Sequence, residues 1–181
     1  MTTFIVLLRA IGPVTHKIMS MAQWRQAVAE AGFTNPETYV ATGNMIVDSE
    51  LGVAEVTRRM NEIVIELGLG PGNTAVVRTA RQMGRLLSAN PLPQAVQANP
   101  QAVAVYFFAR ARPDFGWVED YAGKETIRIE GTHLVVDYVT PVSSSRLPAI
   151  IEKKSGTVTA RNWNTLRGLA TRAAARELRE D

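Results

Sequence analysis

The sequence contains no cysteine, and it has only two histidines among its 181 residues. Without cysteine there can be neither a disulfide nor a thiolate metal site. With His16 and His133 as the only imidazoles, a zinc site would have to be built mainly from carboxylates, which is uncommon in proteins. We therefore expect no bound metal and no cofactor.

Long apolar runs are also missing. The first ten residues, MTTFIVLLRA, hold five consecutive apolar residues with no basic residue before them. A membrane-spanning helix needs about 20 apolar residues, and a signal peptide begins with positive charge. We therefore expect a cytoplasmic protein without a membrane partner. A composition of 46% hydrophobic and 20% charged residues is typical of a globular protein.

Acidic residues are absent from one long segment. Between Lys153 and Arg176 there are six Lys or Arg and no Asp or Glu, and residues 1–29 hold three basic residues and no acid. The intervening residues 30–152 hold ten basic and fourteen acidic residues, a net charge of −4. If the two basic segments meet in space, they predict an anionic partner. The alternative is a solvated helix face.

Hydrophobic periodicity in the first half predicts the element order β-α-β-β-α-β. Strands are expected at residues 3–10, 39–41, 45–47 and 74–79, and helices at 21–31 and 53–67. Ser20 is the expected cap of the first helix, and Gly43-Asn44 the expected tight turn of a hairpin. This order is the split βαβ or ferredoxin-like arrangement, so we predict a four-stranded antiparallel sheet with both helices on one face.

The second half predicts further strands and helices. We expect a helix at 80–90, a loop or hinge at 91–100, a strand at 101–110, a short helix at 114–122, a hairpin across Gly131-Thr132 and a last helix from about 161 to 178. The predicted fold class is α+β with two subdomains. Residues 1–80 form the ferredoxin-like one, and residues 81–181 form a second with a mixed sheet and a basic C-terminal helix.

The start of the predicted last helix gathers residue types that suit an anion. The first N–H groups of a helix are unpaired, and its dipole is positive there. The candidate ligand-binding residues are Thr159, Arg161, Asn162, Trp163, Asn164 and Arg167, together with Arg9 and Lys17 from the basic N-terminal segment. In the alternative interpretation, Trp163 anchors the core and the asparagines satisfy nearby backbone groups. No catalytic residue is assigned, because neither histidine lies in a recognisable motif.

Four sequence pieces resemble a known family. These are LLRAI after the first strand, TYVATGNMIVDS in the first hairpin, SANP before the hinge, and TARNWNTL at the last helix. Over essentially its whole length the chain resembles the bacterial domain-of-unknown-function family 1697 (DUF 1697). The resemblance implies an α+β fold of two subdomains, the first ferredoxin-like, and it implies no activity. Family members usually carry an RGINVGG-like turn where this chain reads RAIGPVTH, so Ala10 and Pro13 stiffen the loop after Arg9.

Three hypotheses for the function follow. The first is a non-enzymatic module that binds an anionic ligand, with nucleic acid as the leading candidate. The second is a protein-interaction or homo-oligomeric domain that uses its sheets or the Trp117/Tyr121 segment. The third is an enzyme on a small phosphorylated or carboxylated substrate, with Arg9, Arg161 and Arg167 as clamps. The sequence predicts no oligomeric state. Base stacking on the first sheet is not expected, because the strand NMIVDS has no aromatic residue.

Overall fold

A computed structural model describes residues 1–179, and it divides the chain into two compact units. The first unit comprises residues 1–85 and the segment from Gly168 onward, and the second comprises residues 86–167. Helix α7 (Trp163–Glu177) begins in the second unit and ends in the first. The sequence predicted a division at residue 80, with residues 81–181 in the second subdomain. The structure instead assigns residues 81–85 and the segment from Gly168 onward to the first unit. None of the helices in the described part is long and apolar enough to span a membrane.

The first unit contains a four-stranded sheet. Its strands are β1 (Thr2–Leu8), β2 (Thr34–Thr38), β3 (Asn44–Ser49) and β4 (Ala75–Thr79). They lie in the order β2-β3-β1-β4, and every neighbouring pair is antiparallel. The predicted four-stranded antiparallel sheet with the element order β-α-β-β-α-β is therefore confirmed.

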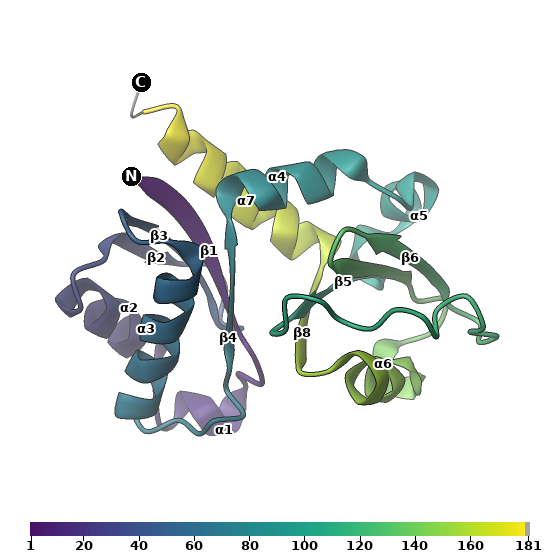
Figure 1. Cartoon of the computed structure of the whole chain (residues 1–181), viewed down its shortest axis with the longest axis horizontal. Coiled ribbons are helices and arrows are strands. Elements are labelled where there is room, and N and C mark those ends of the chain that lie inside the picture. Colours follow the sequence, from purple (N-terminus) through teal and green to yellow (C-terminus); the bar gives the residue numbers. More distant parts are fainter. Residues whose placement is uncertain (180–181) are drawn as a thin grey trace. The chain divides into compact units, whose positions relative to one another are not determined.

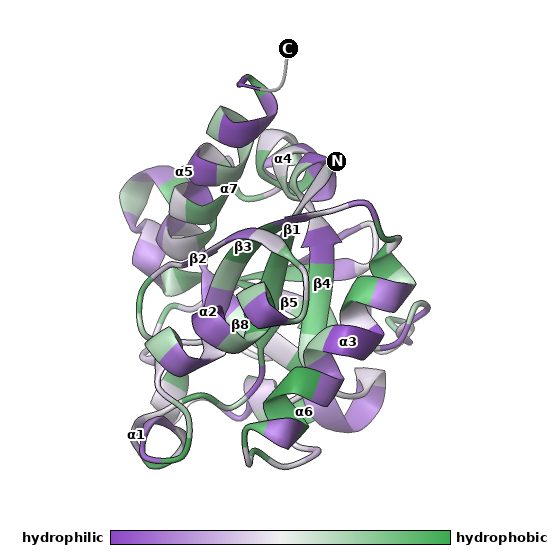
Figure 2. Ribbon diagram, turned by 90° about the vertical axis from the view of Figure 1, so that its left-hand side faces the viewer, coloured by the Kyte–Doolittle hydropathy of each residue, from purple (hydrophilic) through white to green (hydrophobic). Residues whose placement is uncertain are grey.

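Two helices cover one face of this sheet (Figure 1). They are α2 (Met21–Glu30) and α3 (Val53–Glu66), and a short helix α1 (Pro13–His16) precedes them. Phe4, Val6 and Leu8 alternate along β1 and join one buried cluster with Trp24 of α2 and Met60 of α3. Figure 2 shows hydrophobic residues along the central strands and alternating hydrophobic and hydrophilic residues along both helices. Both amphipathic helices thus bury their apolar stripes on the same face, as predicted.

The first hairpin differs from its prediction. Residues 39–41 were expected to be a strand, but β2 ends at Thr38, and the connection to β3 contains Val40 and Gly43, with φ of +48° and +82°. β2 contains Pro36, and its register with β3 shifts between Thr34 and Glu37. Tyr39 and Val40 favour strands intrinsically, but the pairing of β2 with β3 decides where the hairpin forms.

The second unit contains another four-stranded sheet. Its strands are β5 (Val103–Phe108), β6 (Thr126–Glu130), β7 (His133–Asp137) and β8 (Val158–Asn162). The order is β6-β7-β5-β8, and all three pairings are antiparallel, which corrects the prediction of a mixed sheet. The predicted hairpin across Gly131-Thr132 joins β6 to β7. Tyr106, Phe108 and Leu134 pack in one buried cluster with Ile151 of helix α6 (Leu147–Ser155).

Other segments of the second half also differ from their predictions. The expected loop at 91–100 contains helix α5 (Pro93–Ala98) and leads into the 3-10 turn η1 (Pro100–Ala102). Another such turn, η2 (Val142–Ser144), precedes α6. The expected helix at 114–122 is absent, and this segment is irregular with short turns. Helix α4 (Ala80–Ala89) agrees with its prediction.

Candidate functional site

The eight predicted ligand-binding residues belong to different units. Arg9 and Lys17 lie in the first unit, and the six residues from Thr159 to Arg167 lie in the second. Arg9 follows β1, and its Nη1 donates to the carbonyl of Gly72 at 3.1 Å. Lys17 follows α1 at its C-terminal end. The segment from Thr159 to Arg167 passes from strand β8 into α7, so the predicted site is a strand-to-helix junction rather than one helix.

Hydrogen bonds hold the loop after Arg9. The Asn73 carboxamide donates to the carbonyls of Arg9 and Ala10 at 3.1 and 3.3 Å, and the Arg9 amide donates to Thr74 at 2.9 Å. Ala10 has φ of +59°, a conformation that favours glycine. The RGINVGG-like turn that the resemblance implies has glycine where Ala10 stands, so this chain keeps a left-handed backbone position with a residue that is strained there.

Arg161 is partly buried on β8, opposite Val105 of β5. Its Nη1 donates to the Thr159 hydroxyl at 2.6 Å and to the Ala160 carbonyl at 2.8 Å. Desolvation of the guanidinium lowers the pKa of Arg161 from its ordinary value to about 10. Arg161 was expected to begin the last helix, but it lies on strand β8, so strand pairing rather than helical periodicity sets its direction.

The residues around the start of α7 mostly serve the fold. The Asn162 Oδ1 accepts a hydrogen bond from the Thr165 backbone amide at 2.9 Å, so Asn162 caps the helix. Trp163 is only 2% exposed. Arg167 is exposed, and its Nη2 donates to the Asn164 carboxamide oxygen. These contacts agree with the structural interpretation of Trp163 and Asn162, and they leave Arg167 at the surface.

Two arginines of the acid-free segment, near the end of α7, have acidic partners elsewhere in the first unit. The Arg176 guanidinium donates to Glu37 at 3.0 Å and to Asp48 at 3.2 Å, and Arg172 donates to Glu37 at 3.0 Å. Asp48 is 2% exposed and also accepts from the Thr3 hydroxyl at 2.7 Å. The acids that balance these two arginines therefore lie on β2 and β3 of the same unit, far away in sequence.

Three other cations gather at the C-terminal end of α6. We call Arg110, Lys153 and Lys154 the α6 basic cluster; all three are exposed. The lysines lie in the last turn of α6, and the Arg110 Nε lies 3.0 Å from the position of a Cβ built on Gly156, the next residue after the helix. Within residues 1–179, no acidic side chain forms an ion pair with these three cations. Sequence reasoning missed this cluster, although its lysines open the acid-free segment.

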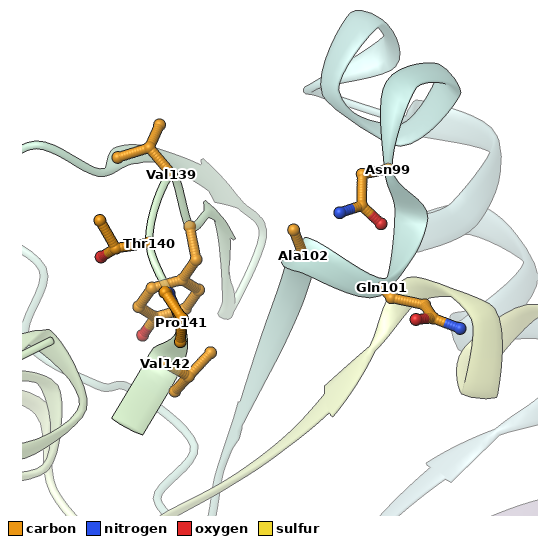
Figure 3. A pocket seen from close by; sticks show the side chains of 8 residues that line it. Asn99, Gln101, Ala102, Val139, Thr140, Pro141 and Val142 are labelled. Atoms are coloured by element: carbon orange, nitrogen blue, oxygen red, sulfur yellow. The ribbon is translucent and has the colours of Figure 1, made fainter. Parts of the chain in front are cut away.

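A surface pocket of about 380 Å³ lies elsewhere in the second unit (Figure 3). Asn99 and Ala102 form one side of it, and the segment from Val139 to Val142 forms the other. Tyr138 also lines it, and its hydroxyl hydrogen-bonds that of Tyr106. No charged side chain is among the lining residues, so this pocket does not itself fit an anionic group.

The Trp117/Tyr121 segment packs against the hydrophobic core of the second unit, to which it belongs, rather than projecting from it. The Trp117 Nε1 donates to the Ser155 hydroxyl at 2.9 Å, and both aromatic rings lie against the hydrophobic cluster beneath α6. The Tyr121 hydroxyl donates to Glu125 at 2.5 Å, and Ser145 donates to the other oxygen of the same carboxylate. These hydrogen bonds occupy the polar atoms of the Trp117 and Tyr121 side chains, which a docking surface would need for a partner.

The two histidines contact main-chain oxygens. The His16 Nε2 lies 2.7 Å from the Ala41 carbonyl, and the His133 Nδ1 lies 3.1 Å from the Glu130 carbonyl. No group of three or more His, Asp or Glu side chains suited to a metal ion occurs in the described part of the chain.

Comparison of folds defines the class of protein. The chain is similar in fold to a solved structure, that of the conserved bacterial protein SP0830 from Streptococcus pneumoniae, with a TM-score of 0.73. The match covers 94% of this chain and 97% of that one at 16% sequence identity, so it shows a shared α+β fold alone. No curated protein matches the sequence. Residues 1–134 match the family described as "Protein of unknown function (DUF1697)", and the chain belongs to this family.

Proposed function

We propose that the protein is a non-enzymatic module that binds an anionic ligand, with nucleic acid as the leading candidate. The observation that carries the proposal is the α6 basic cluster: Arg110, Lys153 and Lys154 are exposed, lie around one helix end and have no acidic partner in the described chain. Clustered cations without internal counterions attract the phosphates of a polyanion.

Lys153 and Lys154 also stabilise helix α6 itself. Cations in the last turn of a helix interact favourably with its dipole, by about 0.3–1 kcal/mol at an exposed site. This effect is small, and it does not require the third cation, Arg110, to lie at the same helix end. The exposed Arg167 of the same unit is a further candidate contact. Of the eight predicted residues, Arg167 best suits a surface phosphate contact, because Arg161 is partly buried and Asn162 caps α7.

Fluorescence anisotropy with labelled mixed-sequence DNA and RNA tests the proposal. Each phosphate contact on duplex DNA contributes about −0.9 to the slope of log affinity against log salt. Replacing Arg110, Lys153 and Lys154 together by Gln should therefore reduce the slope by up to about 2.7. The matched control replaces Arg25, Arg81 and Arg85, exposed cations of the first unit, by Gln. It removes the same net charge and should leave the slope nearly unchanged.

Two results would contradict the proposal. One is the absence of saturable binding to either nucleic acid at low salt. The other is an equal loss of slope in both triple variants, which would show that net charge alone acts rather than the α6 basic cluster.

We also propose a cytoplasmic location and a ferredoxin-like class for the first unit. The strand order β2-β3-β1-β4 supports the latter.

A further inference from the structure

Strand β6 (Thr126–Glu130) forms an edge of the second sheet, and β7 is the strand that pairs with it in the described chain (Figure 1). Its sequence, TIRIE, contains neither proline nor glycine, and its pairing with β7 has no register shift. The edge strand β2 of the first sheet, in contrast, contains Pro36 and an irregular register. Proline and bulges protect edge strands from pairing with other chains, and β6 lacks both.

The hairpin geometry shows which backbone groups of β6 face outward. Gly131-Thr132 forms a two-residue loop between Glu130 and His133, and Gly131 has φ of +59°. Residues that flank such a loop exchange hydrogen bonds, and the pattern alternates along the strand. Glu130 and Arg128 therefore bond to β7, whereas Ile129 and Ile127 turn their N–H and C=O groups outward.

Arg128 and Ile129 of this strand are exposed, Glu130 is half-buried, and Arg128 and Glu130 carry opposite charges. Ile129 is 49% exposed, which is unusual beside the buried Ile127 on the same face of the strand. Arg128 and Glu130 share the opposite face, two residues apart. The Arg128 Nη1 donates to the carbonyl of Ile127 at 3.1 Å, so an arginine now covers one of the outward-facing acceptors.

We propose that β6 pairs antiparallel with β6 of a second copy of this chain, with Ile129 on the two-fold axis. In this register, each Arg128 lies opposite Glu130 of the second copy, and the two Ile129 side chains face each other. The outward groups of Ile129 exchange hydrogen bonds across the axis, and Gly131 of the second copy donates to the Ile127 carbonyl in place of Arg128. Directly opposed charges of opposite sign stabilise strand pairs, and like charges destabilise them. The contact is self-complementary, as a two-fold dimer requires.

A single edge strand buries little area, so the dimer should be weak. Sedimentation velocity of the wild type from about 10 μM to about 1 mM should show conversion of monomer to dimer. Arg128→Glu and Glu130→Arg each turn both cross-strand pairs into like charges, and each should weaken the dimer by on the order of tenfold or more. An equimolar mixture of the two variants restores opposite charges in both pairs, so it should dimerise again. Arg112→Glu, an exposed charge reversal in the preceding loop, is the control and should dimerise like the wild type.

Circular dichroism of every variant should confirm that it is folded. The proposal is overturned if the wild type stays monomeric throughout this range. It is also overturned if the two single variants dimerise as well as the wild type, since another surface would then form the contact. A mixture that stays monomeric excludes the register centred on Ile129.

Discussion

The hydroxyl of Tyr39 occupies the space that a side chain at residue 168 would need. A Cβ built on Gly168 would lie 2.1 Å from this oxygen and 2.5 Å from the ring carbon that bears it. The guanidinium of Arg172, one turn further along α7, lies over the same ring at 4.9 Å from its centroid. The connection between β2 and β3 is thereby joined to α7 by one aromatic side chain.

The first prediction follows from this contact. Replacing Gly by Ala inside a helix normally stabilises it by about 1 kcal/mol. Gly168→Ala should instead lower the free energy of unfolding by about 1–3 kcal/mol, because the Tyr39 ring must leave its place over Arg172. In a Tyr39→Ala background the same change should become stabilising. Urea unfolding of the four proteins measures both effects, and an unchanged sign in the two backgrounds would contradict the contact.

The second prediction concerns the two arginines at the end of α7. The Arg176 side chain is 15% exposed and bonds the buried Asp48, whereas Arg172 is 51% exposed. Arg176→Ala leaves a buried carboxylate without its cation and should cost about 2–4 kcal/mol of unfolding free energy. Arg172→Ala, the matched control on the same helix and the same Glu37, should cost at most about 1 kcal/mol. Equal losses in thermal or urea unfolding would show that Arg176 acts as a surface cation.

The third prediction concerns Trp163, which is 2% exposed at the first position of α7. Truncating a buried tryptophan typically costs about 3–5 kcal/mol. We expect Trp163→Ala to show a loss of that size in urea unfolding, while Trp163→Phe, which keeps part of the buried area, should lose less. A Trp163→Ala protein that unfolds with the parent would mean that the indole contributes little to the core.

The fourth prediction concerns alkaline pH. Desolvation, followed by the hydrogen bond to Glu125, raises the pKa of Tyr121 to about 12, and burial also raises the pKa of Tyr106 and Tyr138. The folded protein keeps these protons where an unfolded chain releases them, near pH 10, so these tyrosines reduce stability as the pH rises from there. Arg161 acts in the opposite direction, because its pKa is lowered to about 10.

Ultraviolet absorbance of phenolate measures this directly. A pH titration of the folded protein should show delayed ionisation of three tyrosines, and Tyr121→Phe should remove the step near pH 12. In urea all the tyrosines should ionise together near pH 10. Delayed ionisation that survives unfolding would be inconsistent with burial as the cause.

Periodicity predicts those elements whose burial pattern is local. The stripes of α2 and α3 repeat every turn, and Ser20 accepts a hydrogen bond from the Gln23 amide at 3.1 Å, as its position before α2 predicts. Elements that depend on a distant strand are harder to predict. Strand β2 contains a proline. The end of β8 was predicted as the start of a helix, but it forms a strand because it pairs with β5. Tertiary pairing overrides local propensity in both cases.

The candidate site shows the same limit. The acid-free segment is visible in the sequence, but Arg172 and its partner Glu37 are 135 residues apart, so the sequence alone does not show that two of its six cations are neutralised. The direction of Arg161 depends on its strand, which was predicted as a helix. The lysines of α6 could be recognised as a basic pair, whereas the approach of Arg110 to Gly156 is a product of folding.

The discontinuous first unit has a consequence for the order in which the protein folds during synthesis. Residues 86–167 leave the ribosome as one continuous stretch, so the second unit has all its parts before translation ends. The first unit has its sheet and two helices early, but Asp48 must wait for Arg176, which lies 128 residues later. Until then a carboxylate destined for burial has no cation beside it. The nascent first unit should therefore gain its full resistance to proteolysis only after the second unit has been made.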